Sequence, residues 1–130
     1  MKISGKFDVS LEPMETYVKG LDGSNIGRMS IDKVFHGELS AKSKGEMLNI
    51  LTSVKGSAGY VAIEQVIGSL SGKKGSFVLQ HYGVMSNESN NLVLEVIPDS
   101  GAGELVGLSG QMIIRNDNGQ HYYDFNYNQV

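Results

Sequence analysis

The sequence predicts an all-β protein: an antiparallel eight-stranded barrel formed by residues 1–130 as a single domain. Apolar and polar residues alternate along most of the chain, which is the period of a strand, and helical periodicity is nearly absent. Turn signals recur roughly every 8–15 residues, as in a meander of about eight strands. The 17 glycines and 2 prolines suit tight turns and close strand contacts. Closure into a barrel is favoured because it removes exposed sheet edges.

The N-terminal part is predicted to form two strands. The first covers residues 3–11, where polarity alternates, and residues 12–24 form a polar connection containing Pro13 and two glycines. The second is long and covers residues 26–41. Its apolar positions of one parity are Met29, Ile31, Phe35 and Leu39.

A third strand is predicted over residues 46–54. The preceding Lys-Ser-Lys-Gly segment, residues 42–45, has the composition of a turn. A second turn at residues 55–57 leads into the next strand.

A β-hairpin is predicted from Ala58 to Met85, with strands over residues 58–70 and 75–85. The turn signal is Ser71-Gly-Lys-Lys74, in which Gly72 is free to take a positive φ. A loop at Gly72–Lys73 and a four-residue loop give the same pairing. In that register Glu64 faces His81, Val66 faces Leu79 and Gly68 faces Phe77.

The C-terminal part contributes three more strands. Residues 86–91 predict a turn, followed by a strand over residues 92–97. Strands over residues 111–115 and 121–127 are joined by Asn116-Asp-Asn-Gly119, whose Asn-Gly pair favours a tight hairpin.

The glycine-rich segment at residues 100–110 lacks the Gly-Lys-Ser/Thr ending of a phosphate-binding loop and precedes a strand. A single helical turn starting at Asp99 or Ser100 is the simpler interpretation. In that interpretation Leu105 and Leu108 plug the barrel.

The two faces of the hairpin differ in the size of their side chains. The face carrying Tyr60, Glu64, His81 and Met85 also carries small residues, which suit the crowded interior of a barrel. The opposite face is therefore assigned outward, and we expect a homodimer to cover it, since symmetric pairs commonly bury such stripes. Its apolar residues are Val61, Ile63, Ile67, Val78, Tyr82 and Val84.

Composition excludes several classes of function. The net charge of −3 and the scattered 11 basic residues disfavour nucleic-acid binding. No apolar run is long enough to span a membrane, and the N-terminus reads as a strand rather than a signal peptide, so we expect a cytoplasmic protein. The absence of cysteine excludes disulfides and thiolate zinc sites.

No known catalytic or metal motif is present. His36, His81 and His121 fit no metal-ligand spacing. No Gly-x-Ser-x-Gly element occurs, which disfavours serine hydrolysis. We therefore expect no metal and no cofactor.

Glu64 and His81 are the main candidate site. They could transfer protons or hold a polar group of a ligand. The competing interpretation is a structural pair that satisfies two polar groups inside the barrel. If the pair serves a ligand, Glu64→Gln and His81→Gln should fold and lose ligand binding.

Four stretches of the chain resemble a family of small bacterial proteins, domain of unknown function 3224. They are Gly45-Glu-Met-Leu48, Ala58-Gly-Tyr-Val-Ala-Ile-Glu64, Gly75-Ser-Phe-Val-Leu-Gln-His81 and Gly101-Ala-Gly-Glu-Leu-Val-Gly-Leu-Ser-Gly110. The resemblance implies the allene oxide cyclase-like barrel, with a glycine-rich plug at residues 101–110 similar to that of allene oxide cyclases and dirigent proteins. It carries over no catalytic residue.

Three functions remain open. The first is a binding protein that holds a small, mostly apolar molecule in the barrel. The second is an isomerase- or cyclase-type enzyme that uses Glu64 and His81. The third is a non-catalytic scaffold or interaction protein with a filled barrel. The candidate ligand-binding residues are Tyr60, Glu64, Phe77, His81 and Met85.

Overall fold

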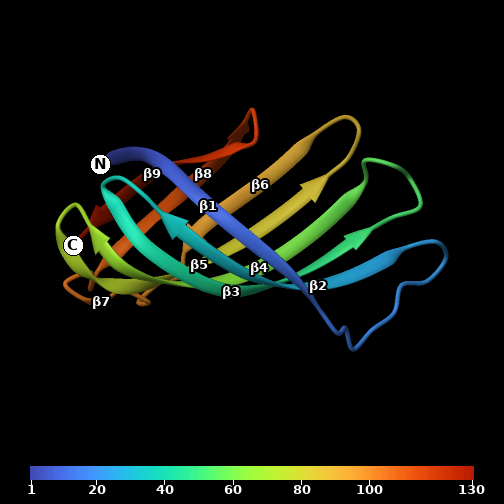
Figure 1. Ribbon diagram of the computed structural model, residues 1–130, viewed down its shortest axis with the longest axis horizontal. Helices are drawn as coiled ribbons and strands as arrows, with labels where there is room; N and C mark the ends of the chain where they lie inside the picture. The colour runs from blue at the N-terminus through green and yellow to red at the C-terminus, as the bar shows by residue number, and fades with distance from the viewer.

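The computed structural model describes residues 1–130 and is a closed antiparallel barrel of eight long strands, with one additional two-residue strand and no helix. Around the barrel the order is β1-β2-β3-β4-β5-β6-β8-β9, and β9 pairs back with β1 (Figure 1). The predicted eight-stranded barrel is thus confirmed. The chain forms no helix that is long and apolar enough to cross a membrane. The strands are β1 (Lys2–Met14), β2 (Asn25–Phe35), β3 (Leu39–Leu51), β4 (Ala58–Leu70), β5 (Lys73–Met85), β6 (Asn90–Val96), β7 (Ala102–Gly103), β8 (Leu108–Asp117) and β9 (Gln120–Gln129).

The turn between β2 and β3 lies at residues 36–38, so the predicted turn at residues 42–45 is wrong. Gly37 takes the positive φ of 107° that the observed turn requires. Residues 42–45 lie within β3, where the two lysines are exposed strand residues and Ser43 points inward. Gly45 serves a close strand contact instead of a turn. A Cβ there would overlap with the carbonyl oxygen of Ile63.

The predicted register of the β4–β5 hairpin is wrong by two residues. The loop is Ser71–Gly72, with φ of 48° and 85°, as a type I′ turn requires, and Leu70 pairs with Lys73. Glu64 therefore faces Leu79, and His81 faces Ala62. Because side chains alternate with a period of two, this slip leaves every residue on its predicted face. Ala62, Glu64, Leu79 and His81 are buried, whereas Val61, Ile63, Tyr82 and Val84 are exposed.

One end of the barrel is filled by a packed core. Its sixteen buried residues include the aromatic rings of Phe7, Phe35 and Tyr123, and Phe77 stacks on Phe125. Leu105 and Leu108 are buried against this core, as predicted for the plug. The predicted helical turn is absent.

The chain before Leu105 follows a different path from a helix. The strand β7 pairs with Gly75 and Ser76 of β5. Asp99 before β7 and Gly103 within it take positive φ values of 62° and 67°, which a right-handed helix cannot contain.

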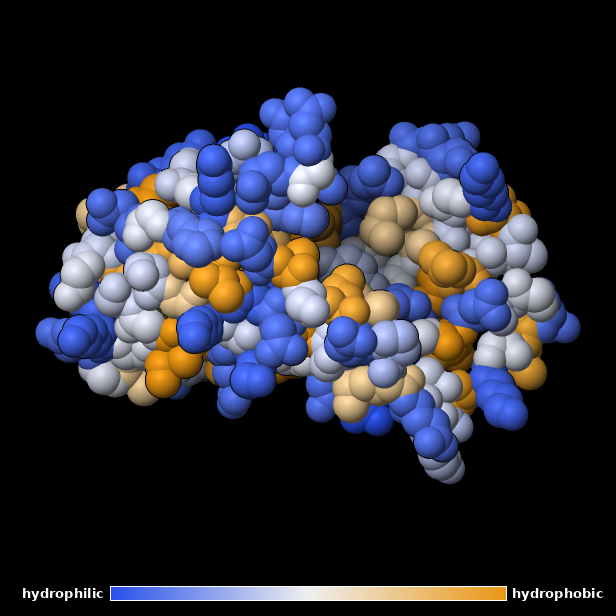
Figure 2. Space-filling model, viewed as in Figure 1, coloured by the Kyte–Doolittle hydropathy of each residue, from blue (hydrophilic) through white to orange (hydrophobic).

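At the opposite end the barrel is open. Inward-facing positions change from buried to partly exposed along β2, β3, β4 and β5. The space-filling surface is hollowed beside β1, where β5 and β6 lie farther back (Figures 1 and 2). We call this end the mouth; it is lined by Met29, Met47, Asn49, Tyr60 and Met85, with Leu11 and Leu92 at its rim.

Candidate functional site

The side chain of Glu64 is fully buried between the packed core and the mouth, and three side chains hydrogen-bond to it. Lys33 Nζ on β2 lies 3.1 Å from Oε1, and His81 Nε2 on β5 lies 3.1 Å from the same oxygen. Ser43 Oγ on β3 donates to Oε2 at 3.0 Å. Tyr60 on β4 extends this series of hydrogen bonds, since its hydroxyl lies 3.2 Å from Nδ1 of His81. We call these five residues the polar network.

Strand pairing brings the network together. Lys33 and Ser43 are direct cross-strand partners, and Gly45 is the partner of Glu64. A side chain at Gly45 would contact the Cβ of Glu64 at 2.7 Å, so glycine leaves the space through which Ser43 and Lys33 reach the carboxylate. His81 sits two residues from the partner of Glu64 on the same face, a distance that long side chains bridge.

The network fixes the protonation of Glu64. Burial acts to raise the pKa of Glu64, but the hydrogen bond from His81 and the positive charge of Lys33 outweigh burial, so this pKa lies below its usual value. The side chain is a carboxylate at neutral pH and accepts from all three partners. The neutral form of His81 therefore carries its hydrogen on Nε2 and accepts at Nδ1; this tautomer is assigned from the partners of the ring.

Tyr60 is the only member of the network that is partly exposed to solvent. Burial and the negative charge of Glu64 raise the pKa of Tyr60 to about 12. Tyr60 is thus a neutral phenol at physiological pH, and it donates its hydrogen to the neutral form of His81. Its oxygen keeps lone pairs that a donor in the mouth could use.

Lys33 is buried with its counter-charge and two aromatic rings. Its Nζ lies 5.0 Å from the ring centroid of Phe7 and 5.8 Å from that of Phe35. Such contacts favour a buried ammonium group. Even so, a buried ion pair gives little stability over an apolar pair of the same size, so its presence invites a functional explanation.

The network is closed to solvent except at Tyr60. Glu64 is 0% exposed and His81 is 3% exposed. Five surface pockets of the barrel are lined by other residues. A molecule in the mouth would therefore meet Tyr60 first, with His81 and Glu64 behind it.

Gly83 makes room for the ring of Tyr60, so we expect Gly83→Ala to break the hydrogen bond between Tyr60 and His81. The added Cβ would lie 2.6 Å from Cε1 of Tyr60, which must then swing away. Loss of one such bond should cost about 0.5–1.5 kcal/mol of stability. Thermal melts and acrylamide quenching of tyrosine fluorescence would measure both effects.

Gly59→Ala is the matched control on the same hairpin. A Cβ there has its nearest neighbours at 3.6 and 3.9 Å, which are ordinary contacts. Equal quenching in the two variants would contradict the role assigned to Gly83.

The other residues singled out from sequence lie apart. Met85 lines the mouth, whereas Phe77 belongs to the packed core at the closed end. His36 pairs with Asp8 on the surface at 2.9 Å, and His121 packs on the ring of Phe7. No group of three or more acidic, histidine or cysteine side chains is arranged to hold a metal ion.

Lys33 and Ser43 are the site residues that the sequence alone did not identify. The sequence did contain an indication for Lys33, because it alternates in step with the apolar residues Ile31 and Phe35 and so lies on the same face of the strand. A lysine at an inward-facing strand position indicates a buried charge partner. Ser43 was hidden because its neighbours have the composition of a turn.

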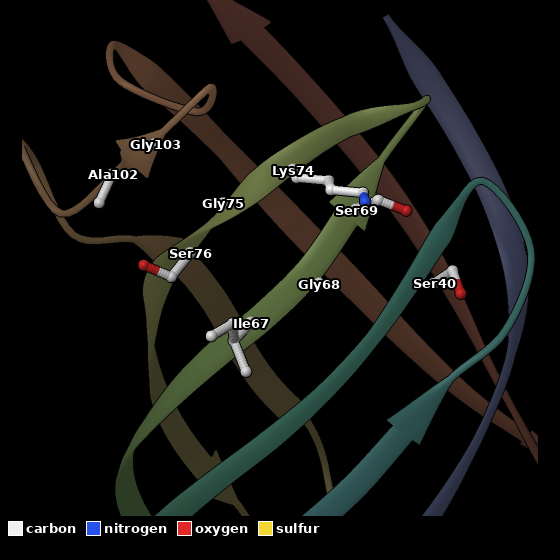
Figure 3. A pocket seen from close by; sticks show the side chains of 9 residues that line it. All are labelled: Ser40, Ile67, Gly68, Ser69, Lys74, Gly75, Ser76, Ala102 and Gly103. Carbon is white, nitrogen blue, oxygen red and sulfur yellow. The ribbon is translucent and has the colours of Figure 1, made fainter.

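A shallow groove outside the barrel is a second concave surface (Figure 3). It lies between β4, β5 and β7 and encloses about 640 Å³. Three glycines form much of it, and Lys74 is its one charged residue. The backbone N–H of Lys74 already donates to Glu104 at 2.8 Å. No buried polar side chain lines this groove, so the polar network remains the stronger candidate.

The chain is similar to proteins of one family. The family described as "Protein of unknown function (DUF3224)" matches residues 3–127. A crystal structure of a protein with unknown function from this family, from Shewanella oneidensis MR-1, is 58% identical in sequence, with a TM-score of 0.98. That match covers 100% of this chain and 98% of the other. No curated protein matches.

Proposed function

This chain belongs to the DUF3224 family, and we propose that it binds a small, mostly apolar molecule in the mouth of the barrel, with one polar group of that molecule hydrogen-bonded to Tyr60. One observation carries the proposal. The buried polar network ends at a partly exposed phenol inside a mostly apolar mouth. Apolar walls with one or a few placed polar groups are the usual composition of a small-molecule site.

The lining of the mouth supports an apolar ligand. Met29, Met47 and Met85 are flexible and polarizable side chains that adapt to the shape of a bound molecule. Leu11 and Leu92 extend the apolar surface to the rim. Removal of this surface from water would supply the affinity, and the hydrogen bond to Tyr60 would supply orientation.

The polar network supports a fixed orientation of Tyr60. The neutral form of His81 accepts the hydrogen of Tyr60 and is itself held by Glu64, which Lys33 and Ser43 hold in turn. The phenol oxygen is thereby presented to the mouth as an acceptor. A ligand hydroxyl or amide N–H is the matching group.

Two observations favour binding over proton-transfer catalysis by Glu64 and His81. Both side chains lie behind Tyr60, out of reach of a molecule in the mouth. The pKa of Glu64 lies below its usual value, which makes this carboxylate a weak base. A scaffold with a filled barrel would account for the packed end but not for the apolar mouth.

Titration with 2-naphthol and naphthalene tests this proposal. The two probes differ by one hydroxyl, and the chain has no tryptophan to obscure their fluorescence. We expect 2-naphthol to bind about 3- to 10-fold more tightly, the value of one hydrogen bond. Tyr60→Phe should remove this preference, and Tyr17→Phe, on an exposed loop, should keep it.

A second pair of variants locates the binding site. Met29→Arg places a charge in the mouth and should weaken binding of both probes, whereas Ser30→Arg on the outer face of β2 should not. Circular dichroism would confirm that both variants keep the barrel. Unchanged affinity of both probes for the Met29→Arg variant, or no binding of either probe to the wild-type protein, would refute the proposal.

A further inference from the structure

The outer surface of the barrel carries apolar rows that cross four strands. Strand pairing aligns Leu48 of β3, Val61 of β4, Tyr82 of β5 and Val93 of β6 in one row. All four side chains are at least one-third exposed.

The neighbouring rows add exposed apolar side chains on both sides. In one of them Gly59 separates the two side chains, which leaves a groove between them. We call the whole surface the outer stripe; it comprises Leu48, Ile50, Val61, Ile63, Tyr82, Val84 and Val93.

The outer stripe has the size of an interface. At about 4.8 Å between strands, four strands span roughly 15 Å. With Val18, which borders the groove, the exposed apolar side chains present on the order of 600 Å². A standard interface buries about 800 Å² per partner, including its polar rim. Gln65 and Gln80 lie beside the stripe and would form part of such a rim.

The charges around the outer stripe favour a copy of the same surface as its partner. Arg28 and Glu46 at one edge neutralise each other in an ion pair, Lys44 pairs with Asp32, and Glu95 on β6 is a single carboxylate without an ion pair. The surface around the outer stripe therefore has no excess of positive or negative charge that would attract a strongly acidic or basic partner. The same pattern disfavours an anionic lipid surface, which requires clustered basic residues.

We propose that the outer stripe is the interface of a homodimer in which the β3–β6 faces of two copies pack against each other around a two-fold axis. Sheets pack face to face at about 10 Å through such apolar rows. In a two-fold contact each row meets the equivalent surface of the second copy, so one apolar patch serves both partners. The mouth is formed by inward-facing residues and is not part of this interface.

Light scattering of the protein eluting from a sizing column tests the proposal. We expect the mass of two chains over about 1 to 100 µM. Val61→Lys, at the centre of the outer stripe, should raise the dissociation constant of the dimer at least about tenfold. Ile113→Lys, at an exposed outward position on β8, is the matched control and should leave the mass unchanged.

Each other outcome overturns the proposal. Wild-type protein with the mass of one chain at about 100 µM would show that the outer stripe does not drive association. A dimer that resists Val61→Lys, or that dissociates equally with Ile113→Lys, would show that another surface forms the contact. Because both substitutions are at exposed positions, neither should prevent folding.

Discussion

Glu64→Gln is expected to destabilise the protein by about 3–5 kcal/mol at pH 7, because it leaves the buried charge of Lys33 without a partner. Lys33 lies in an environment of aromatic rings and cannot reach water. The amide would still accept a hydrogen bond, but it cannot compensate a charge. Urea unfolding monitored by circular dichroism would measure the loss.

Two variants make this prediction specific. Glu46→Gln removes the carboxylate of an exposed pair with Arg28 and should cost less than about 1 kcal/mol. The double variant Lys33→Met/Glu64→Gln removes both charges and should be more stable than the sum of the two single changes predicts. Additive effects in the double variant would contradict a buried ion pair.

The pKa of Glu64 adds a dependence on pH. Its folded-state value lies below the unfolded value near 4.3, so the carboxylate contributes stability above that pH. This contribution should be lost as the pH falls below about 4 and through the folded-state pKa. Wild-type protein should therefore lose more stability than Glu64→Gln between neutral pH and that acid range, as melting temperatures would show.

The presence of Lys33 changes the effect that the sequence alone predicts for Glu64→Gln. A Glu–His pair without further charge predicts that Glu64→Gln folds and loses only ligand binding. With a buried lysine beside the carboxylate, the same change becomes a stability change first. Tyr60→Phe is consequently the better test of ligand binding, since it leaves the Lys33–Glu64 pair intact.

Leu105→Ala is expected to cost about 2–5 kcal/mol, because the Leu105 side chain fills the closed end of the barrel. The residue is buried against the aromatic core, and the surrounding strands are too constrained by pairing to collapse into the space. Urea unfolding of the variant would give this value directly.

Val106→Ala is the control for the plug, since the adjacent side chain is exposed. It should change stability by no more than about 0.5 kcal/mol. Similar losses in both variants would mean that the turn at residues 104–107, rather than the buried leucine, determines the effect.

The sequence predicted the architecture because its signals are periodic. Alternation identified the inward face of the β4–β5 hairpin, and that assignment survived a two-residue error in register. The error arose at Ser71, which takes a left-handed conformation that is uncommon for serine. Of the two loop residues, only Gly72 could be recognised from the sequence as a residue that takes a positive φ.

The site was predicted in part. Glu64, His81 and Tyr60 were recognisable because one hairpin carries all three on one face. Lys33 and Ser43 come from another pair of strands, and their approach to Glu64 depends on the turn at Gly37 and the close contact at Gly45. Local composition predicts a turn at Gly45, but the turn is at Gly37 and Gly45 lies within a strand. The sequence alone therefore could not show that Lys33 and Ser43 approach Glu64.

A crystal structure of the protein with 2-naphthol is the most direct test of the proposed function. We predict that the naphthalene ring lies in the mouth against Met29, Met47 and Met85, with its hydroxyl about 2.7–2.8 Å from the phenol oxygen of Tyr60. The Tyr60–His81–Glu64 hydrogen bonds should remain in place. An empty mouth, or naphthol bound away from Tyr60, would contradict the proposed function.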